Sequence, residues 1–163
     1  MWLLVRLFSI FSLLLLIITH IYVLFIGTFL VNDISAMVLF DSGASRSFVS
    51  LALSKRFSRA SGELDYPLNV EIEDDRTVRA ARVHRGCTLW LFDEQFSVDL
   101  VPILLQGNKV IVGMDWLSPN GAMIDCEQQL VRVHTPSGGE LVIQGEWPHR
   151  EPIFCSAARA RRH

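Results

Sequence analysis

The residues best suited to chemistry in this 163-residue chain are the consecutive Asp41, Ser42, Gly43 and Ala44. They follow directly on the apolar run 36–40, which suits a buried strand, so a strand delivers a carboxylate to the start of a tight turn. The serine hydroxyl and the glycine N–H are well placed to hydrogen-bond a neighbouring carboxylate. A carboxylate held in this way can activate a water molecule. A second apolar motif that ends in glycine, Ile111-Val112-Gly113, follows about 70 residues later and strengthens this interpretation.

Other chemistries find little support in the sequence. The three cysteines lack zinc-ligand spacing and are an odd number for a disulfide framework (Cys87, Cys126 and Cys155). A reducing compartment fits them best, although one disulfide with one free thiol stays open. The five histidines are dispersed, and no Lys-Ser or Lys-Thr follows Gly138-Gly139 to make a phosphate loop. Because the net charge is −2, nothing favours nucleic acid, and we expect no nucleic-acid partner, no metal and no cofactor.

Short strands separated by turns fill the chain after residue 26, which predicts an all-β domain with one or two short helices. The turn Asn32-Asp33 separates strands at 28–31 and 34–40, and the second strand leads to Asp41. One helix is expected within 48–57 and another at Ser118-Pro119, with Ser as cap and Pro at the first helical position. Further strands are predicted at 68–72, 77–83, 87–92, 95–103, 110–113, 122–126, 130–134 and 140–144.

The first 26 residues are almost wholly apolar. Residues 7–26 carry no charge, and as a helix they would cross a hydrocarbon core of about 30 Å. We therefore expect a hydrophobic leader or transmembrane anchor at 1–26, a folded domain at 27–146 and a basic, disordered tail at 147–163. The alternative, that the leader is a gene-model artefact, stays open. With a real leader the protein is membrane-associated, and without it the protein is cytoplasmic.

Residues 38–50 strongly resemble the active-site segment of retropepsin-like aspartic proteases, in the branch encoded by plant Ty3/gypsy-type LTR retrotransposons. Residues 110–117 resemble the Gly-Met-Asp-Trp-Leu signature of the same branch. Shorter segments at 85–87, 99–103 and 124–127 also match in order and spacing. The resemblance covers roughly residues 27–146.

The resemblance implies a closed, barrel-like retropepsin fold with Asp41 at the floor of a cleft. Ser42 would hydrogen-bond across a two-fold axis, and Gly43 and Ala44 would support the active-site loop. The motif Ile111-Val112-Gly113 would brace that loop from beneath.

The resemblance also implies that the hairpin 70–83 is a flap that closes on a peptide. Its tip is Asp74-Asp75-Arg76, where this branch usually has a glycine in the turn. Because an aspartate adopts a left-handed conformation only at some cost, we expect the hairpin to survive but to open less easily.

Such a protease needs two carboxylates about 3 Å apart that share one proton, so that one acts as base and the other as acid. The chain contains one Asp-Ser-Gly motif, and we interpret Asp115 as a helix-start or packing residue and Asp125 as a structural acid at a strand end. A homodimer with one Asp41 from each subunit therefore follows. We expect an aspartic endopeptidase that processes a retroelement polyprotein. The alternative is a catalytically inactive or fragmentary remnant of a retrotransposon, with or without a membrane anchor.

Overall fold

The computed structural model describes residues 3–6, 24–72, 76–125 and 127–145. Most of these residues lie in strands, and the two described helices are single turns. A mostly-β architecture with few short helices is thus confirmed. The elements in chain order are β1 (Leu3–Arg6), β2 (Leu24–Val31), β3 (Ile34–Asp41), β4 (Phe48–Ser50), α2 (Leu51–Ser54), β5 (Gly62–Ile72), β6 (Arg76–Leu91), β7 (Glu94–Ile103), β8 (Lys109–Val112), α3 (Met114–Leu117), β9 (Met123–Asp125), β10 (Leu130–His134) and β11 (Glu140–Gln144).

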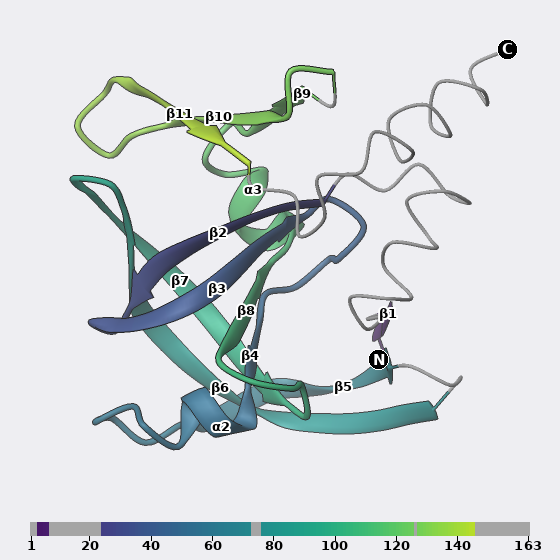
Figure 1. The fold of residues 1–163 in the computed structure, drawn as a ribbon. Helices are drawn as coiled ribbons and strands as arrows, with labels where there is room; N and C mark the ends of the chain where they lie inside the picture. The colour runs from purple at the N-terminus through teal and green to yellow at the C-terminus, as the bar shows by residue number, and fades with distance from the viewer. Residues whose placement is uncertain (1–2, 7–23, 73–75, 126, 146–163) are drawn as a thin grey trace, which may run out of the picture.

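The main sheet closes on itself (Figure 1). Its strands follow the order β1-β5-β6-β2-β3-β8-β4-β7, and β7 pairs back with β6, so the strands from β6 to β7 form a ring. A second sheet, β11-β10-β9, lies beyond α3 on one side of this ring. Its buried residues Val131, Val133 and Ile143 belong to the same apolar core as Phe40 and Trp116. The small sheet therefore covers one side of the barrel core.

The hairpin that leads to Asp41 forms as predicted at its turn. Asn32 and Asp33 have φ values of 47° and 64°, as the two central residues of a type I′ turn require. The Asn32 side chain also accepts a hydrogen bond from the backbone N–H of Thr88, at 2.9 Å. This contact ties the turn to β6 and fixes the start of β3.

The hydrophobic N-terminal helix expected within residues 1–26 is not supported. Residues 24–26 belong to β2, where Leu24 pairs with Asp41 and Phe25 with Phe40. Leu3–Arg6 form strand β1, which pairs in parallel with β5. Residues 7–23 and the expected tail at 147–163 lie outside the described residues. No helix of the described part is long and apolar enough to span a membrane. An apolar run does not by itself distinguish strand from helix, and here the pairing with β3 decides.

Strand β6 is longer than the sequence predicted. The expected strands at 77–83 and 87–92 form one strand of 16 residues, which pairs first with β5 and then with β2 and β7. Its register shifts between His84 and Cys87, at Gly86, whose φ is +64°. A glycine accepts this left-handed conformation without a steric penalty, so the strand bends and continues instead of ending.

The two short helices differ from the expected ones. Phe48–Ser50 are strand β4, and only the four residues that follow are helical, with the Ser50 side chain as cap. The second helix, α3, begins directly after Gly113 and ends before Ser118, so the helix start expected at Ser118-Pro119 is wrong. The backbone N–H groups at the start of α3 instead bond to the loop that follows Asp41.

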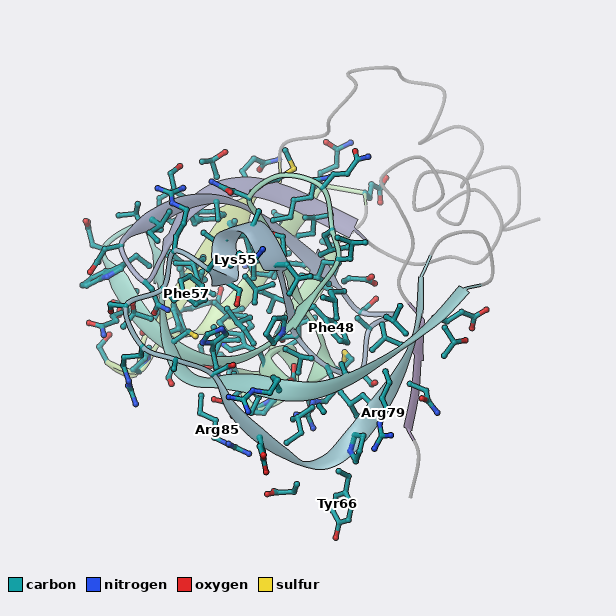
Figure 2. All side chains as sticks on the ribbon, turned by 90° about the horizontal axis from the view of Figure 1, so that it is seen from below. Phe48, Lys55, Phe57, Tyr66, Arg79 and Arg85 are labelled. Atoms are coloured by element: carbon teal, nitrogen blue, oxygen red, sulfur yellow. The ribbon has the colours of Figure 1, made fainter. Side chains whose placement is uncertain are left out.

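The core divides into two apolar clusters. The larger fills the space between the ring and the small sheet. The smaller joins the Asp41 side of the molecule to the β5–β6 hairpin, and it includes Leu39, Ala44, Phe48, Val70 and Ile111. Figure 2 shows Phe48 inside the barrel, whereas Tyr66 on β5 points away from it and is exposed.

Candidate active site

Asp41 is the last residue of β3, a strand hydrogen-bonded on both sides. On one side Leu24 of β2 lies opposite Asp41, and on the other side β8 runs parallel, with Phe40 paired to Val112. The Asp41 residue is only 4% exposed, and it is the one buried acidic residue among the described parts of the chain. The sheet therefore delivers a single carboxylate to a position almost free of solvent.

The turn after β3 holds this carboxylate. The Gly43 N–H donates a 2.8 Å hydrogen bond to Asp41 Oδ1, and the Ala44 N–H donates a 3.2 Å hydrogen bond to the Asp41 carbonyl oxygen. Burial raises the pKa of the Asp41 carboxyl above its ordinary value of 3.8, and hydrogen bonds from Gly43 and Ala44 oppose this rise without cancelling it. A carboxyl with a raised pKa keeps a proton more readily, as a proton-sharing pair requires.

Ser42 and Gly43 face outward from this turn, whereas Ala44 is fully buried. Ser42 is half-buried, and within the described residues its hydroxyl has no hydrogen-bond partner. A hydroxyl can act as both donor and acceptor.

The motif Ile111-Val112-Gly113 lies against the active-site turn. Ile111 and Val112 belong to β8, whose parallel pairing with β3 fixes the level at which β3 ends. Directly after β8, the N–H of Met114 donates to the Ala44 carbonyl oxygen at 2.7 Å. A Cβ atom on Gly113 would lie 2.6 Å from the same oxygen, so only glycine allows the two backbones to approach this closely.

The predicted flap is a regular hairpin of β5 and β6, with Val70 paired to Val78 and Ile72 paired to Arg76. Of the tip residues, Asp74 and Asp75 lie outside the described residues, and Arg76 is the first residue of β6. The base of the hairpin packs on the active-site side of the core, because Leu68, Val70 and Ala80 share a cluster with Ala44 and Ile111.

Asp115 and Asp125 both have structural contacts. Asp115 lies in the first turn of α3, where its carboxylate accepts hydrogen bonds from the N–H and the hydroxyl of Ser47 at 3.2 and 2.7 Å. Asp125 ends β9 and accepts the backbone N–H groups of Glu127 and Gln128 at 3.0 and 2.9 Å. The sequence did not identify Ser47 as a site residue. The only local indication of its role was its position as a polar residue directly before the apolar pair Phe48-Val49.

One histidine has an unexpected partner. Nε2 of the buried His84 lies 2.7 Å from the Ser54 hydroxyl, and the His84 and Phe57 rings pack in a T-shaped arrangement. Among the described residues no carboxylate bonds to this ring, so the acid of a serine-type triad is missing.

His84 also lines a cavity of about 500 Å³ beside the turn of Asn32 and Asp33, at the end of β3 opposite Asp41. This cavity is therefore not the candidate active site.

Residues 19–138 match the family described as retroviral aspartyl protease. The chain belongs to this family. None of the curated proteins matches the chain in sequence. Among solved structures, the retroviral protease-like domain of Ddi1 from Leishmania major is similar with a TM-score of 0.50 at 15% identity, over 72% of this chain and 94% of that one. EIAV protease complexed with the inhibitor HBY-793 has a TM-score of 0.48 at 19% identity, over 61% of this chain and 90% of that one.

Membership in the retroviral aspartyl protease family supports an aspartic-type hydrolase function. Proteins of the retropepsin family act as dimers on polypeptide substrates. The matched region begins at residue 19, inside the apolar run 7–26 that we expected to be a leader. It also contains the active-site turn and the motif that ends in Gly113.

Proposed function

We propose that the protein is an aspartic endopeptidase that acts as a homodimer, with one Asp41 from each subunit. The observation that carries the proposal is the single buried carboxylate of Asp41, held by the Gly43 N–H on an Asp-Ser-Gly-Ala turn. One protomer supplies half of the pair that this chemistry needs. The Asp41 of a second subunit, related to the first by a two-fold axis beside the turn, supplies the other half.

In the proposed mechanism the two Asp41 carboxyls share one proton. The ionised carboxyl takes a proton from water, the water oxygen attacks the scissile carbonyl carbon, and the protonated carboxyl donates its proton to the carbonyl oxygen. The tetrahedral intermediate then collapses: the C–N bond breaks as the carboxyl that took the water proton gives it to the leaving nitrogen, and the other carboxyl takes a proton back from a hydroxyl of the intermediate. No covalent enzyme intermediate forms. The raised pKa of Asp41 supports the protonated role, and a second carboxyl nearby would raise it further because like charges disfavour double ionisation.

We propose a retroelement polyprotein as substrate, in line with the resemblance of residues 38–50 and 110–117 to the plant Ty3/gypsy branch. In the proposed dimer the hydroxyl of the half-buried Ser42 bonds to the partner's turn across the two-fold axis. In that position it would hold the two Asp41 residues at a fixed separation.

The test uses the full chain, its Asp41→Asn variant and an Asp93→Asn control, which makes the same chemical change at an exposed turn. Cleavage of an unbiased peptide library is measured at about pH 4 to 7, with and without pepstatin, beside analytical ultracentrifugation. We expect dimers, pepstatin-sensitive cleavage by the wild type and the control, and none by Asp41→Asn.

A mixing experiment tests the shared site. When wild type is exchanged to equilibrium with an equal amount of Asp41→Asn, only about a quarter of the dimers hold two aspartates, so activity per wild-type chain falls by about half. Unchanged activity per wild-type chain would show that one subunit suffices. A folded monomer without cleavage at any pH would refute the enzyme and leave the non-catalytic remnant.

A further inference from the structure

A closed set of hydrogen bonds joins the loop after Asp41 to the start of α3. The N–H of Met114 donates to the Ala44 oxygen at 2.7 Å and the N–H of Asp115 donates to the Ser45 oxygen at 3.2 Å. In the opposite direction, the N–H of Ser47 donates to Asp115 Oδ2 at 3.2 Å. Both backbone–backbone and backbone–side-chain hydrogen bonds thus fix the loop to the start of α3.

The Ser47 hydroxyl lies at the centre of this set and is completely buried. It accepts the Gly113 N–H at 3.0 Å and donates to Asp115 Oδ1 at 2.7 Å. Because Gly113 supplies the donor on one side, the hydroxyl proton must point to Asp115. The contact is therefore charge-assisted, and its loss would leave a buried N–H without a partner.

Arg46 completes the cluster. Its Nε lies 3.7 Å from Asp115 Oδ2, and the two side chains are 33% and 26% exposed. This Nε is buried and makes no hydrogen bond to any described residue, so its contact with Asp115 is an ion pair without a hydrogen bond. The guanidinium of Arg46 thus adds an ion pair to the Asp115 carboxylate, whose two oxygens accept the N–H and the hydroxyl of Ser47.

Ala44 connects the cluster to the reacting group. Its N–H faces Asp41, and its C=O accepts the N–H of Met114. A peptide chain that is fixed at both ends holds its N–H directions, so a shift of the α3 start moves the donors that hold the Asp41 carboxylate.

We propose that Asp115, acting through Ser47, is a positioning residue for Asp41 in the peptidase. This proposal rests on the proposed function, which it deepens by assigning to Asp115 the task of keeping the active-site turn in its productive geometry. Arg46 assists through its ion pair with Asp115.

The test compares full-length wild type with Asp115→Asn, Ser47→Ala and the double variant. An asparagine at 115 keeps the shape and one acceptor, but its NH₂ group meets a donor of Ser47. Asp125→Asn is the matched control, because Asp125 also accepts two hydrogen bonds but lies at the end of β9, away from the turn. We expect each single variant to lower kcat about tenfold or more with KM changed less than about threefold, and the control to stay near wild type. The double variant should be no worse than the more damaged single one, because both remove the same contact.

A second readout is independent of turnover. The pKa of the Asp41 carboxyl, followed by carbon NMR in each variant, should rise by about half a unit or more in Asp115→Asn and Ser47→Ala, because misaligned Gly43 and Ala44 donors no longer lower it. It should not move in Asp125→Asn.

The outcomes separate the two proposals. If wild type cleaves but Asp115→Asn matches Asp125→Asn in kcat and in the Asp41 titration, the positioning role is refuted and the peptidase stands. If wild type does not cleave, the peptidase is refuted. The Asp41 titration then decides alone whether Asp115 holds the turn.

Discussion

The sharpest consequence of the structure concerns Gly113, where a single methyl group should disturb both stability and the active site. In Gly113→Ala the new Cβ would overlap the Arg46 carbonyl oxygen, and it would lie 2.6 Å from the Ala44 oxygen and 2.8 Å from the Arg46 carbonyl carbon. All three are backbone atoms of the active-site loop, so no side chain can rotate away. The loop must move, by about 1 Å to restore ordinary contact distances.

That movement strains the hydrogen bonds from Met114 to Ala44, from Asp115 to Ser45 and from Gly113 to Ser47. At a net value of about 1 kcal/mol for each bond, the loss of unfolding free energy is about 3 kcal/mol. Insertion of a methyl group into a packed site typically costs about 1–3 kcal/mol, which agrees with this value. Activity should fall about a hundredfold, because the loop carries the donors that orient Asp41.

Urea unfolding at one fixed protein concentration, beside peptide cleavage, measures both effects. With a slope of about 2 kcal/mol per molar urea, the midpoint of Gly113→Ala should fall by about 1.5 M. The matched control is Gly62→Ala, whose Cβ would meet the end of the flexible Arg85 side chain at 3.4 Å and the Val83 carbonyl oxygen at 4.0 Å, both ordinary contact distances. Its stability and activity should change little. If Gly113→Ala unfolds within about 0.5 kcal/mol of wild type, the close approach of the two backbones is refuted.

Two further predictions concern buried titratable groups. Asp41→Asn should raise the melting temperature at neutral pH, because burial disfavours the carboxylate of the wild type. The gain should shrink as pH falls through the raised pKa of Asp41, because the wild-type carboxyl then takes up a proton. A gain of equal size in Asp93→Asn would contradict this origin. Burial lowers the pKa of His84 from 6.5, so the unfolded chain binds a proton at a higher pH than the folded one. The unfolding free energy of wild type should therefore fall as pH drops below about 6.5, and that of His84→Gln should fall less. Parallel pH profiles of wild type and variant would show instead that His84 titrates alike in the folded and unfolded states.

Much of the sheet was readable from local sequence. The Asn32-Asp33 pair between two apolar runs predicted the turn that leads to Asp41, because few residues accept a positive φ at both positions. The segments 95–103, 130–134 and 140–144 lie within a residue of β7, β10 and β11, since each has its own pattern and turn. These turns and strands depend on residues close together in the chain, so local sequence patterns predict them directly.

Other features depend on partners far away in the chain. The apolar residues 24–26 extend β2 because β3 offers them an edge, and the same residues in isolation fit a helix equally well. Strand β6 continues through Gly86 because β5, β2 and β7 all pair with it. No local pattern contains this information.

For the candidate site, the sequence by itself determined the acid, its turn and the distant glycine motif, because their residue types follow from the backbone conformations that they need. Only the tertiary structure brought Ser47 to Asp115, 68 residues apart, and placed Gly113 against Ala44 and Arg46. It also decided the burial of Asp41, which raises its pKa. Burial and contacts of this kind arise when separate strands close into one barrel, and no segment of the chain has them alone.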